Sequence, residues 1–244
     1  MQTSKGEKML IFIDIETTGL SHEDKICSIA LINLDTKEYK QELINEGKKI
    51  PPQASSVHHI TNEMIKNKST FKESAIYKYL QDNNCDEHTL VSPHIKFDLE
   101  KLVSSGFVWK GDVIDTLRVA KHLIPECEFF SLQILRYELK LYKGEEEEKL
   151  NFGIKDALVA HDALSDALVN KLLFEYLHEL ASVDEMKKLT FKNVLIQKFT
   201  FGKHKGKYIE EVCRNDRNYL EWMLNNLEDL DDDMRYSVNY YLQG

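Results

Sequence analysis

The pattern of hydrophobic and polar residues predicts three strands near the start of the chain. Residues 9–15 and 26–33 are apolar, β-branched runs separated by a turn that contains Gly19, and residues 39–44 alternate weakly. Such runs, bounded by turns, are typical of strands that follow one another in a meander. A further short strand is predicted at residues 88–92.

Apolar residues at helical spacing follow these strands. They predict helices at residues 71–80, 99–103, 132–139 and 157–180. Strands followed by alternating strands and helices favour an α/β fold, in which helices pack on a mixed sheet. The acidic run Glu145–Glu148 falls between two predicted helices and is interpreted as a solvated loop.

The end of the chain predicts a small module of its own. Residues 199–201 and 208–209 are interpreted as strands of a hairpin around the basic loop 202–207, whose two glycines mark a tight turn. A helix follows. Its apolar face, interpreted as the core of the module, comprises Tyr219, Leu220, Met223, Leu224 and Leu227.

Charge divides the chain into three parts. The formal charge of −9, from 32 basic and 41 acidic residues, excludes a broad basic surface that would coat duplex DNA. Residues 187–207 nevertheless contain seven lysines and no acidic residue. We therefore predict a large α/β domain at residues 1–186, a basic connector at 187–198 and a small α+β module at 199–244.

Composition also bears on the compartment. No apolar run approaches the roughly 20 residues of a membrane helix, so no membrane partner is expected. The first residues show no pattern of a secretory signal. The four cysteines lie far apart, which predicts reduced thiols rather than a zinc site or disulfides. A cytoplasmic location is expected.

Two carboxylates at the end of the first predicted strand are the strongest candidates for chemistry. Asp14 and Glu16 are two residues apart, so both project from one face of the strand, while Ile13 and Ile15 point to the other. Adjacent carboxylates repel unless a cation lies between them, and such oxygen ligands suit Mg²⁺ or Mn²⁺. The alternative is an exposed strand edge with two solvated acids.

Three further polar residues are candidates on weaker grounds. Asp98 opens a helical pattern and could equally be a helix N-cap. His161 and Asp166 are five residues apart, about 140° around an ideal helix, so they converge more easily if His161 precedes the helix and Asp162 caps it. Taken alone, each of them could be structural.

Together these segments resemble the three motifs of the DEDDh exonuclease superfamily, which includes polymerase proofreading subunits and ribonuclease T. The sequences are DIETTGL from Asp14, HIKFDLEKL from His94 and HDALSDA from His161, in the order and separation of that superfamily. The segment FTFGKHKGKYIEEV from Phe199 is similar to the tail of its exodeoxyribonuclease X subfamily.

The resemblance implies a ribonuclease-H-like fold, a mixed five-stranded sheet flanked by helices, and the release of nucleoside 5′-monophosphates from a 3′ end with two Mg²⁺ or Mn²⁺ ions. The residues that it implies for metal binding and catalysis are Asp14, Glu16, Asp98 and Asp166. His161 is implied as the general base, since an imidazole can accept a proton near neutral pH. The residues implied to bind the terminal nucleotide are Thr17, Thr18, Leu20, His58 and Phe97.

The sequence departs from the superfamily pattern at two places. Pro93 and His94 stand where the second motif usually has His and Asn, and His59 stands at the usual Gly of a V-H-G-I-T segment. The roles of the usual residues at these positions are not transferred. The five core positions are unaltered.

These observations predict a metal-dependent 3′–5′ exodeoxyribonuclease for DNA with a free 3′ end, single-stranded or a frayed duplex, with a role in DNA repair. The alternatives are an exoribonuclease that processes RNA ends and a catalytically silent nucleic-acid-binding subunit. Three loop lysines, Lys203, Lys205 and Lys207, are candidates for phosphate contacts, or else keep a solvated loop soluble.

Overall fold

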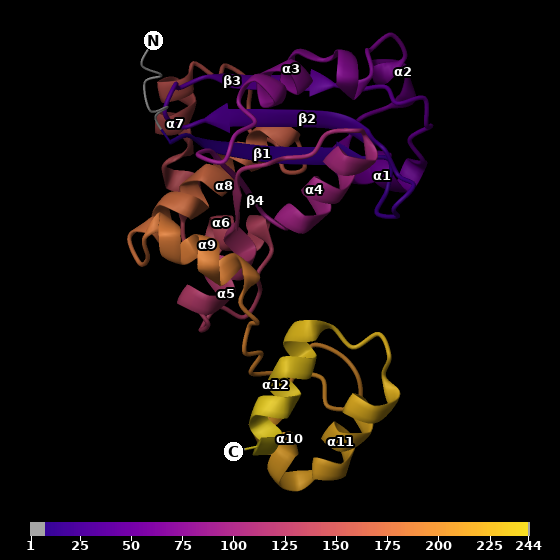
Figure 1. Cartoon of the computed structure of the whole chain (residues 1–244), viewed down its shortest axis with the longest axis vertical. Coiled ribbons are helices and arrows are strands. Elements are labelled where there is room, and N and C mark those ends of the chain that lie inside the picture. Colours follow the sequence, from indigo (N-terminus) through magenta and orange to yellow (C-terminus); the bar gives the residue numbers. More distant parts are fainter. Residues whose placement is uncertain (1–7, 244) are drawn as a thin grey trace. The chain divides into compact units, whose positions relative to one another are not determined.

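A mixed sheet lies at the centre of the first of two structural units (Figure 1). The computed structural model describes residues 8–243, and the chain divides into Met1–Thr190 and Phe191–Gly244. Within the described residues the sheet has five strands in the order β3-β2-β1-β4-β5. Their bounds are β1 Leu10–Thr17, β2 Ile26–Asn33, β3 Tyr39–Leu43, β4 Thr89–Ser92 and β5 Asp112–Asp115. The predicted mixed five-stranded sheet is confirmed.

Strand pairing follows the predicted meander and then changes direction. Strand β2 pairs antiparallel with both β1 and β3, whereas β4 pairs parallel with β1 and β5. Strand β5 was not predicted, because Val113 and Ile114 are its only apolar residues. The parallel strands matter for function, since β1 and β4 end on the same side of the sheet.

Helices cover both faces of this sheet. Their bounds in the first unit are α1 Pro52–His58, α2 Asn62–Ile65, α3 Ala75–Asp82, α4 Ile95–Ser104, α5 Thr116–Leu123, α6 Leu132–Glu138, α7 Glu145–Phe152, α8 Ala163–His178 and α9 Val183–Phe191. Residues of α5, α6 and α8 pack with Phe12, Val91 and Ile114 on one face. Residues of α3 and α4 pack with Ile11, Ile13 and Ile15 on the other.

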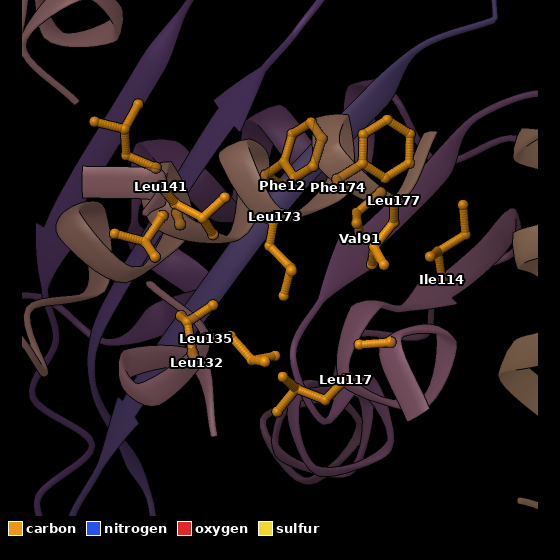
Figure 2. Packing of buried hydrophobic residues seen from close by; sticks show 14 of the residues in the cluster. Phe12, Val91, Ile114, Leu117, Leu132, Leu135, Leu141, Leu173, Phe174 and Leu177 are labelled. Atoms are coloured by element: carbon orange, nitrogen blue, oxygen red, sulfur yellow. The ribbon is translucent and has the colours of Figure 1, made fainter. Parts of the chain in front are cut away.

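The alternation along β1 sets the orientation of the site. Phe12 lies in the cluster on the α8 side and meets Phe174 edge to face, with ring centroids 5.2 Å apart (Figure 2). Because side chains alternate along a strand, Asp14 and Glu16 continue the face of Phe12. They therefore face α8, which carries Asp166.

Two local expectations in this unit were wrong. Glu145–Glu148 is not a loop but the first turn of α7, where acidic residues interact favourably with the helix dipole. Glu145 is buried against Arg136. The last long helix begins at Ala163 rather than residue 157, because Asp162 caps it by accepting a hydrogen bond from the Ser165 amide.

The second unit packs three helices around its own core. They are α10 Ile209–Asn215, α11 Arg217–Asn226 and α12 Asp232–Gln243, and the predicted apolar face contributes the buried residues Leu220 and Met223. The predicted hairpin is wrong in part, because only an isolated bridge joins Lys198 to Tyr208. Ile209 is not in a strand but begins α10, and its side chain is fully buried in this core.

Two further findings bear on the sequence expectations. All four cysteines are free thiols, as predicted. Among residues 8–243, no helix is long and apolar enough to cross a membrane.

Candidate active site

Asp14 and Glu16 lie in β1 at a local irregularity of the sheet. The pairing between β1 and β2 shifts between Glu16 and Thr17, so that Cys27 is passed over as a bulge. A bulge increases local twist and reorients the side chains beside it. Both carboxylates are half-buried at this end of the strand.

Asp98 reaches the same region from α4. This helix begins at Ile95, so Asp98 lies in its first turn and is not its N-cap, contrary to one reading of the sequence. The side chain is buried and accepts a hydrogen bond from the Ser92 hydroxyl at the end of β4. Burial raises the pKa of Asp98 to about 8, against the opposing effect of the Ser92 hydrogen bond.

His161 precedes α8, as the spacing argument required. Its backbone is left-handed, with φ of 62°, and its amide donates to Asp166 Oδ2 at 3.3 Å. Gln41 of β3 donates to Asp162 Oδ1 at 2.5 Å and so ties the start of α8 to the sheet. These contacts place His161 beside Asp166, although an uninterrupted helix would separate them.

Glu16, His161 and Asp166 form a compact cluster. One ligand atom of each lies within 4.8 Å of the others. Burial and the charges of Asp166, Asp162 and Asp98 raise the pKa of Glu16 to about 8. Burial also raises the pKa of Asp166 to about 7, while the hydrogen bond from the His161 amide lowers it.

Half-buried Asp14 is likewise repelled by neighbouring carboxylates. Burial, followed by the charges of Asp98, Asp166 and Glu16, raises its pKa well above the ordinary value. Four crowded carboxylates are stabilised in their charged forms by a cation among them. Oxygen ligands with one imidazole nearby are a donor set that suits Mg²⁺ or Mn²⁺, so the residues present fit a divalent metal site.

A chain of hydrogen bonds holds Asp166 in place. Gln133 Nε2 donates to Asp166 Oδ1 at 2.6 Å, and Arg136 Nη1 donates to Gln133 Oε1 at 3.1 Å. Arg136 in turn forms two hydrogen bonds with Glu145, at 2.5 and 2.7 Å. Gln133, Arg136 and Glu145 were not among the site residues predicted from the sequence. The only available signal was the i, i+3 spacing of Gln133 and Arg136 on one predicted helix.

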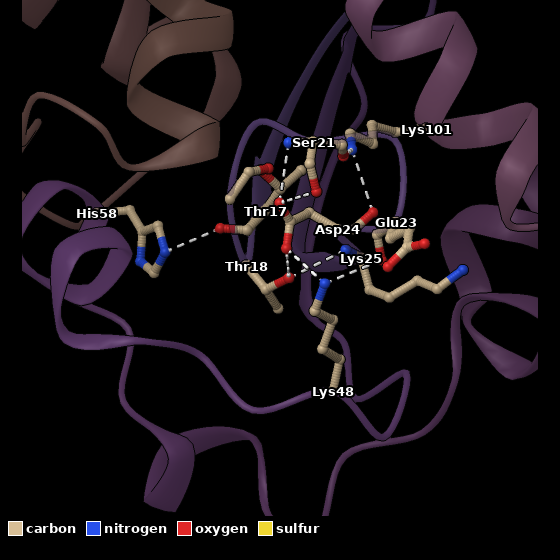
Figure 3. Close-up of polar contacts among 10 residues, drawn as sticks. Thr17, Thr18, Ser21, Glu23, Asp24, Lys25, Lys48, His58 and Lys101 are labelled. Atoms are coloured by element: carbon tan, nitrogen blue, oxygen red, sulfur yellow. Dashed lines mark hydrogen bonds and ion pairs between the residues drawn. The ribbon is translucent and has the colours of Figure 1, made fainter.

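The loop after β1 contains Thr17, Thr18 and Leu20. Asp24 organises it, because this carboxylate accepts hydrogen bonds from Thr18 Oγ1 and from the amide and hydroxyl of Ser21 (Figure 3). A Cβ at Gly19 would lie 2.5 Å from Asp24 Oδ2, so only glycine fits there. Thr17 and Thr18 are buried, whereas Leu20 is 87% exposed at the surface.

Two lysines fix this loop from outside. Lys48 Nζ lies 2.7 Å from Asp24 Oδ1, and their hydrogen bond lowers the pKa of Asp24. Buried Lys101 of α4 donates to the backbone carbonyls of Ser21 and Asp24, at 2.5 and 3.1 Å (Figure 3). Lys48 and Lys101 were not predicted from the sequence, since their partners are distant in the chain. Asp24 was not predicted either, although its partners Thr18 and Ser21 are near in sequence.

His58 and Phe97, two of the predicted nucleotide-binding residues, have different surroundings. His58 is buried, with Nε2 3.2 Å from the carbonyl oxygen of Thr17, and burial lowers its pKa. It also lines a cavity of about 650 Å³ that reaches His161. Thr17, Thr18, Leu20 and Phe97 do not line that cavity. Half-buried Phe97 instead packs under Lys101, whose Nζ lies 5.1 Å from the ring centroid.

Of the three residues that depart from the superfamily pattern, His59 and His94 have left-handed backbone, whereas Pro93 does not. His59 follows α1 with φ of 61°, and His94 precedes α4 with φ of 59°. Glycine adopts this conformation freely, and Asn and His are enriched in it among other residues. The left-handed backbone therefore favours the usual Gly at position 59 and the usual Asn at position 94, and histidine also tolerates this conformation.

The three loop lysines are not equivalent. Lys203 Nζ lies 2.8 Å from Asp216 Oδ2, so its charge is already paired. Lys205 and Lys207 are exposed, and no ion pair to either is found among the described residues. Farther back in the predicted connector, Lys187 belongs to α9 and pairs with Asp112 at 2.7 Å.

Comparison with known proteins agrees with this fold. The chain belongs to the exonuclease family, whose model matches residues 11–174, and residues 199–228 match the exodeoxyribonuclease X-like C-terminal family. It is 28% identical to exodeoxyribonuclease 10 of Escherichia coli, over 97% of this chain and all of that protein. It is also 28% identical to the DNA polymerase III epsilon subunit of Treponema pallidum, over 62% of this chain and 76% of that one.

Solved structures show the same fold. Exonuclease X in complex with 5′ overhanging duplex DNA superimposes with a TM-score of 0.59 at 24% identity, over 74% of this chain and 99% of that one. E. coli exonuclease I in complex with a dA16 oligonucleotide superimposes with a TM-score of 0.51 at 17% identity. The match covers 75% of this chain and 42% of that one. The resemblance to DEDDh exonucleases and to the exodeoxyribonuclease X subfamily is confirmed, and the chain is a nuclease with the ribonuclease-H-like fold.

Proposed function

We propose that the chain is a metal-dependent exodeoxyribonuclease that degrades DNA from a free 3′ end and releases nucleoside 5′-monophosphates. The observation that carries the proposal is the cluster of Glu16, His161 and Asp166, with ligand atoms within 4.8 Å of one another. Substrates are single strands and frayed duplex ends. The similarity to exodeoxyribonuclease 10 over its whole length supports DNA over RNA.

The acidic residues have distinct tasks in this proposal. Asp14 would hold two divalent ions, Glu16 and Asp166 would complete the site nearest His161, and Asp98 would support the other. Two bound Mg²⁺ or Mn²⁺ ions supply charge neutralisation at the phosphate and activation of the attacking water. Gln133 keeps one oxygen of Asp166 occupied, which fixes the direction of the other.

His161 acts as the general base. The left-handed backbone turns it out of α8, so its exposed ring can reach the attacking water, while its amide contacts Asp166. Thr17 and Thr18 present backbone groups to the terminal nucleotide, and the Asp24 network keeps that loop rigid. Exposed Leu20, buried His58 and half-buried Phe97 complete the nucleotide subsite. A role in DNA repair in the cytoplasm is part of this proposal, and the free thiols support a reducing compartment.

The test is digestion of 5′-labelled DNA and of RNA with the same sequence by the full chain in Mg²⁺. The expected result is a ladder of DNA products shortened from the 3′ end and none when that end carries a blocking group. Preferential digestion of RNA would establish the exoribonuclease alternative instead. Shortening from the 5′ end would refute the proposed direction.

Two variants test the assigned roles. Asp14→Ala should abolish metal-dependent cleavage, because the carboxylate shared by both ions is lost. His161→Ala should lower kcat by roughly 10²- to 10⁴-fold, the contribution typical of general base catalysis. His161→Ala should still bind DNA in Ca²⁺. Turnover near that of the wild type in either variant would contradict its role.

A further inference from the structure

Positive charge in the second unit is concentrated on one segment. From residue 191 onward the chain has eight basic and nine acidic residues, so the unit is close to neutral. Five of the basic residues are lysines between 192 and 207, a segment without any acidic residue. Elsewhere in the unit, two arginines form ion pairs within helices, Arg214 with Glu210 and Arg217 with Glu221. The lysine segment is therefore where this unit could meet an anion.

The loop at the end of this segment is firmly anchored. The backbone closes on itself, with Phe199 N donating to Lys207 O at 3.0 Å and Gly206 N donating to Phe199 O at 2.7 Å. His204 is buried, and its Nε2 lies 2.9 Å from Asp216 Oδ2. Because these hydrogen bonds fix the backbone of the loop, exposed Lys205 and Lys207 extend into solvent from a rigid support.

An aromatic surface adjoins this loop. Lys203 Nζ lies 5.7 Å from the ring centroid of Tyr219, and a Cβ at Gly202 would meet the Tyr219 hydroxyl at 2.8 Å. Tyr219 stacks on Trp222, with centroids 5.9 Å apart and an interplanar angle of 28°. Trp222 remains 48% exposed, so much of its indole surface is left open next to Tyr219, which Lys203 contacts.

We propose that Trp222 and the Lys203–Lys207 loop form a binding platform for single-stranded nucleic acid. A base stacks on the indole of Trp222, and Lys205 and Lys207 contact the neighbouring phosphates. Exposed aromatic rings beside unpaired cations are the usual means of binding single strands without sequence preference. The inference deepens the proposed function and rests on one part of it, namely that the chain binds nucleic acid.

The charge count favours a single strand over a duplex. Only two lysines of the loop are free of ion pairs in the described part of the chain, which is too few for strong binding through phosphates alone. Stacking must therefore contribute much of the affinity. Bases within a duplex are stacked on one another and offer Trp222 no open face, whereas unpaired bases do.

The chain offers a direct spectroscopic probe of this contact. It contains two tryptophans, and Trp109 is 9% exposed with its indole nitrogen donating to the Asp112 carbonyl at 3.1 Å. Titration of the full chain with oligothymidylate in EDTA, where no cleavage occurs, should quench the fluorescence of Trp222. The quench should persist in Trp109→Phe and disappear in Trp222→Phe.

Affinity provides the second measurement. Trp222→Ala should weaken binding of the oligothymidylate roughly 5- to 100-fold, the range for losing one stacked base, whereas Trp222→Phe should retain most of the affinity. Tyr240→Ala is the matched control, since Tyr240 is also exposed on a helix of this unit but packs against Tyr241. Unchanged melting temperatures would confirm that the variants fold.

Three outcomes would overturn the platform. They are absence of a quench in Trp109→Phe, wild-type affinity in Trp222→Ala, and equal quenching by a duplex of the same composition. Shortening of 5′-labelled oligothymidylate by the wild type in Mg²⁺ is measured separately. If no shortening occurs while the quench does, the proposed function is wrong and the platform stands as a site that only binds nucleic acid.

Discussion

Replacing Glu16 by Gln should stabilise the metal-free protein at alkaline pH. Burial and neighbouring carboxylates raise the pKa of Glu16 from 4.5 to about 8, so the folded state holds this proton more tightly than the unfolded chain does. Between these two values the folded state binds more protons, and the free energy of unfolding therefore falls as the pH rises. Above pH 8 the loss is complete.

The structure sets the size of the effect. A shift of this size corresponds to about 5 kcal/mol at 1.36 kcal/mol per pKa unit. The other carboxylates share the same repulsion and take up protons in its place, so we expect a gain of roughly 2 to 5 kcal/mol for Glu16→Gln at pH 9. For a unit of this size that is a rise of roughly 5 to 15 °C in melting temperature.

The assay follows unfolding of the first unit through Trp109, with Trp222→Phe as the common background, in EDTA at pH 5, 7 and 9. The two proteins should melt within a few degrees of each other at pH 5 and diverge steadily above it. Mg²⁺ should then stabilise the Glu16 protein more than the Gln variant, because the cation relieves the same repulsion. If the difference in melting temperature between the two proteins were the same at all three pH values in EDTA, the reasoning would be refuted.

Three further outcomes are expected. Gln133→Leu should raise the Mg²⁺ dissociation constant roughly 10- to 100-fold by calorimetric titration, and unchanged metal affinity would contradict the role given to this amide. Glu145→Ala should destabilise the protein by roughly 3 to 5 kcal/mol in urea unfolding, since it leaves Arg136 buried without its partner; a neutral effect would show that water reaches this arginine. Lys205→Gln combined with Lys207→Gln should reduce the slope of log K against log salt by about 1.4 for single-stranded DNA, and an identical slope would exclude phosphate contacts.

Local rules account for much of the candidate site. The two-residue spacing of Asp14 and Glu16 was sufficient to place them on one face of a strand, and the structure confirms that this face meets α8. The capping preference of Asp162 indicated a helix that begins after His161, as α8 does. Both inferences depend only on neighbouring residues, so no knowledge of packing was required.

The parts that could not be predicted depend on contacts between distant segments. Gln133 meets Asp166 only because α6 packs beside α8, and the two residues are 33 positions apart in the chain. Glu145 belongs to an acidic run whose composition predicts solvent exposure, yet Arg136 draws it into the interior. The sequence pattern contains no information about such pairings.

The sign of the backbone angle φ is a second property that hydrophobic periodicity does not predict. His59, His94 and His161 all adopt left-handed φ, and nothing in the hydrophobic pattern distinguishes these positions. For His59 and His94 the structure supplies the physical reason for what had been only departures from a motif. A residue other than Gly, Asn, Asp or His at either position would be strained by roughly 1 to 2 kcal/mol.

The alternation of β1 also has a genetic consequence. Because both faces of this strand are covered, Ile11, Ile13 and Ile15 cannot exchange places with Phe12, Asp14 and Glu16 without exchanging core and active site. An in-frame deletion of a single codon before Asp14 would move every later side chain of β1 to the opposite face. Such a deletion would remove folding and catalysis in one step, whereas codon deletions in the exposed turn between β2 and β3 should be tolerated.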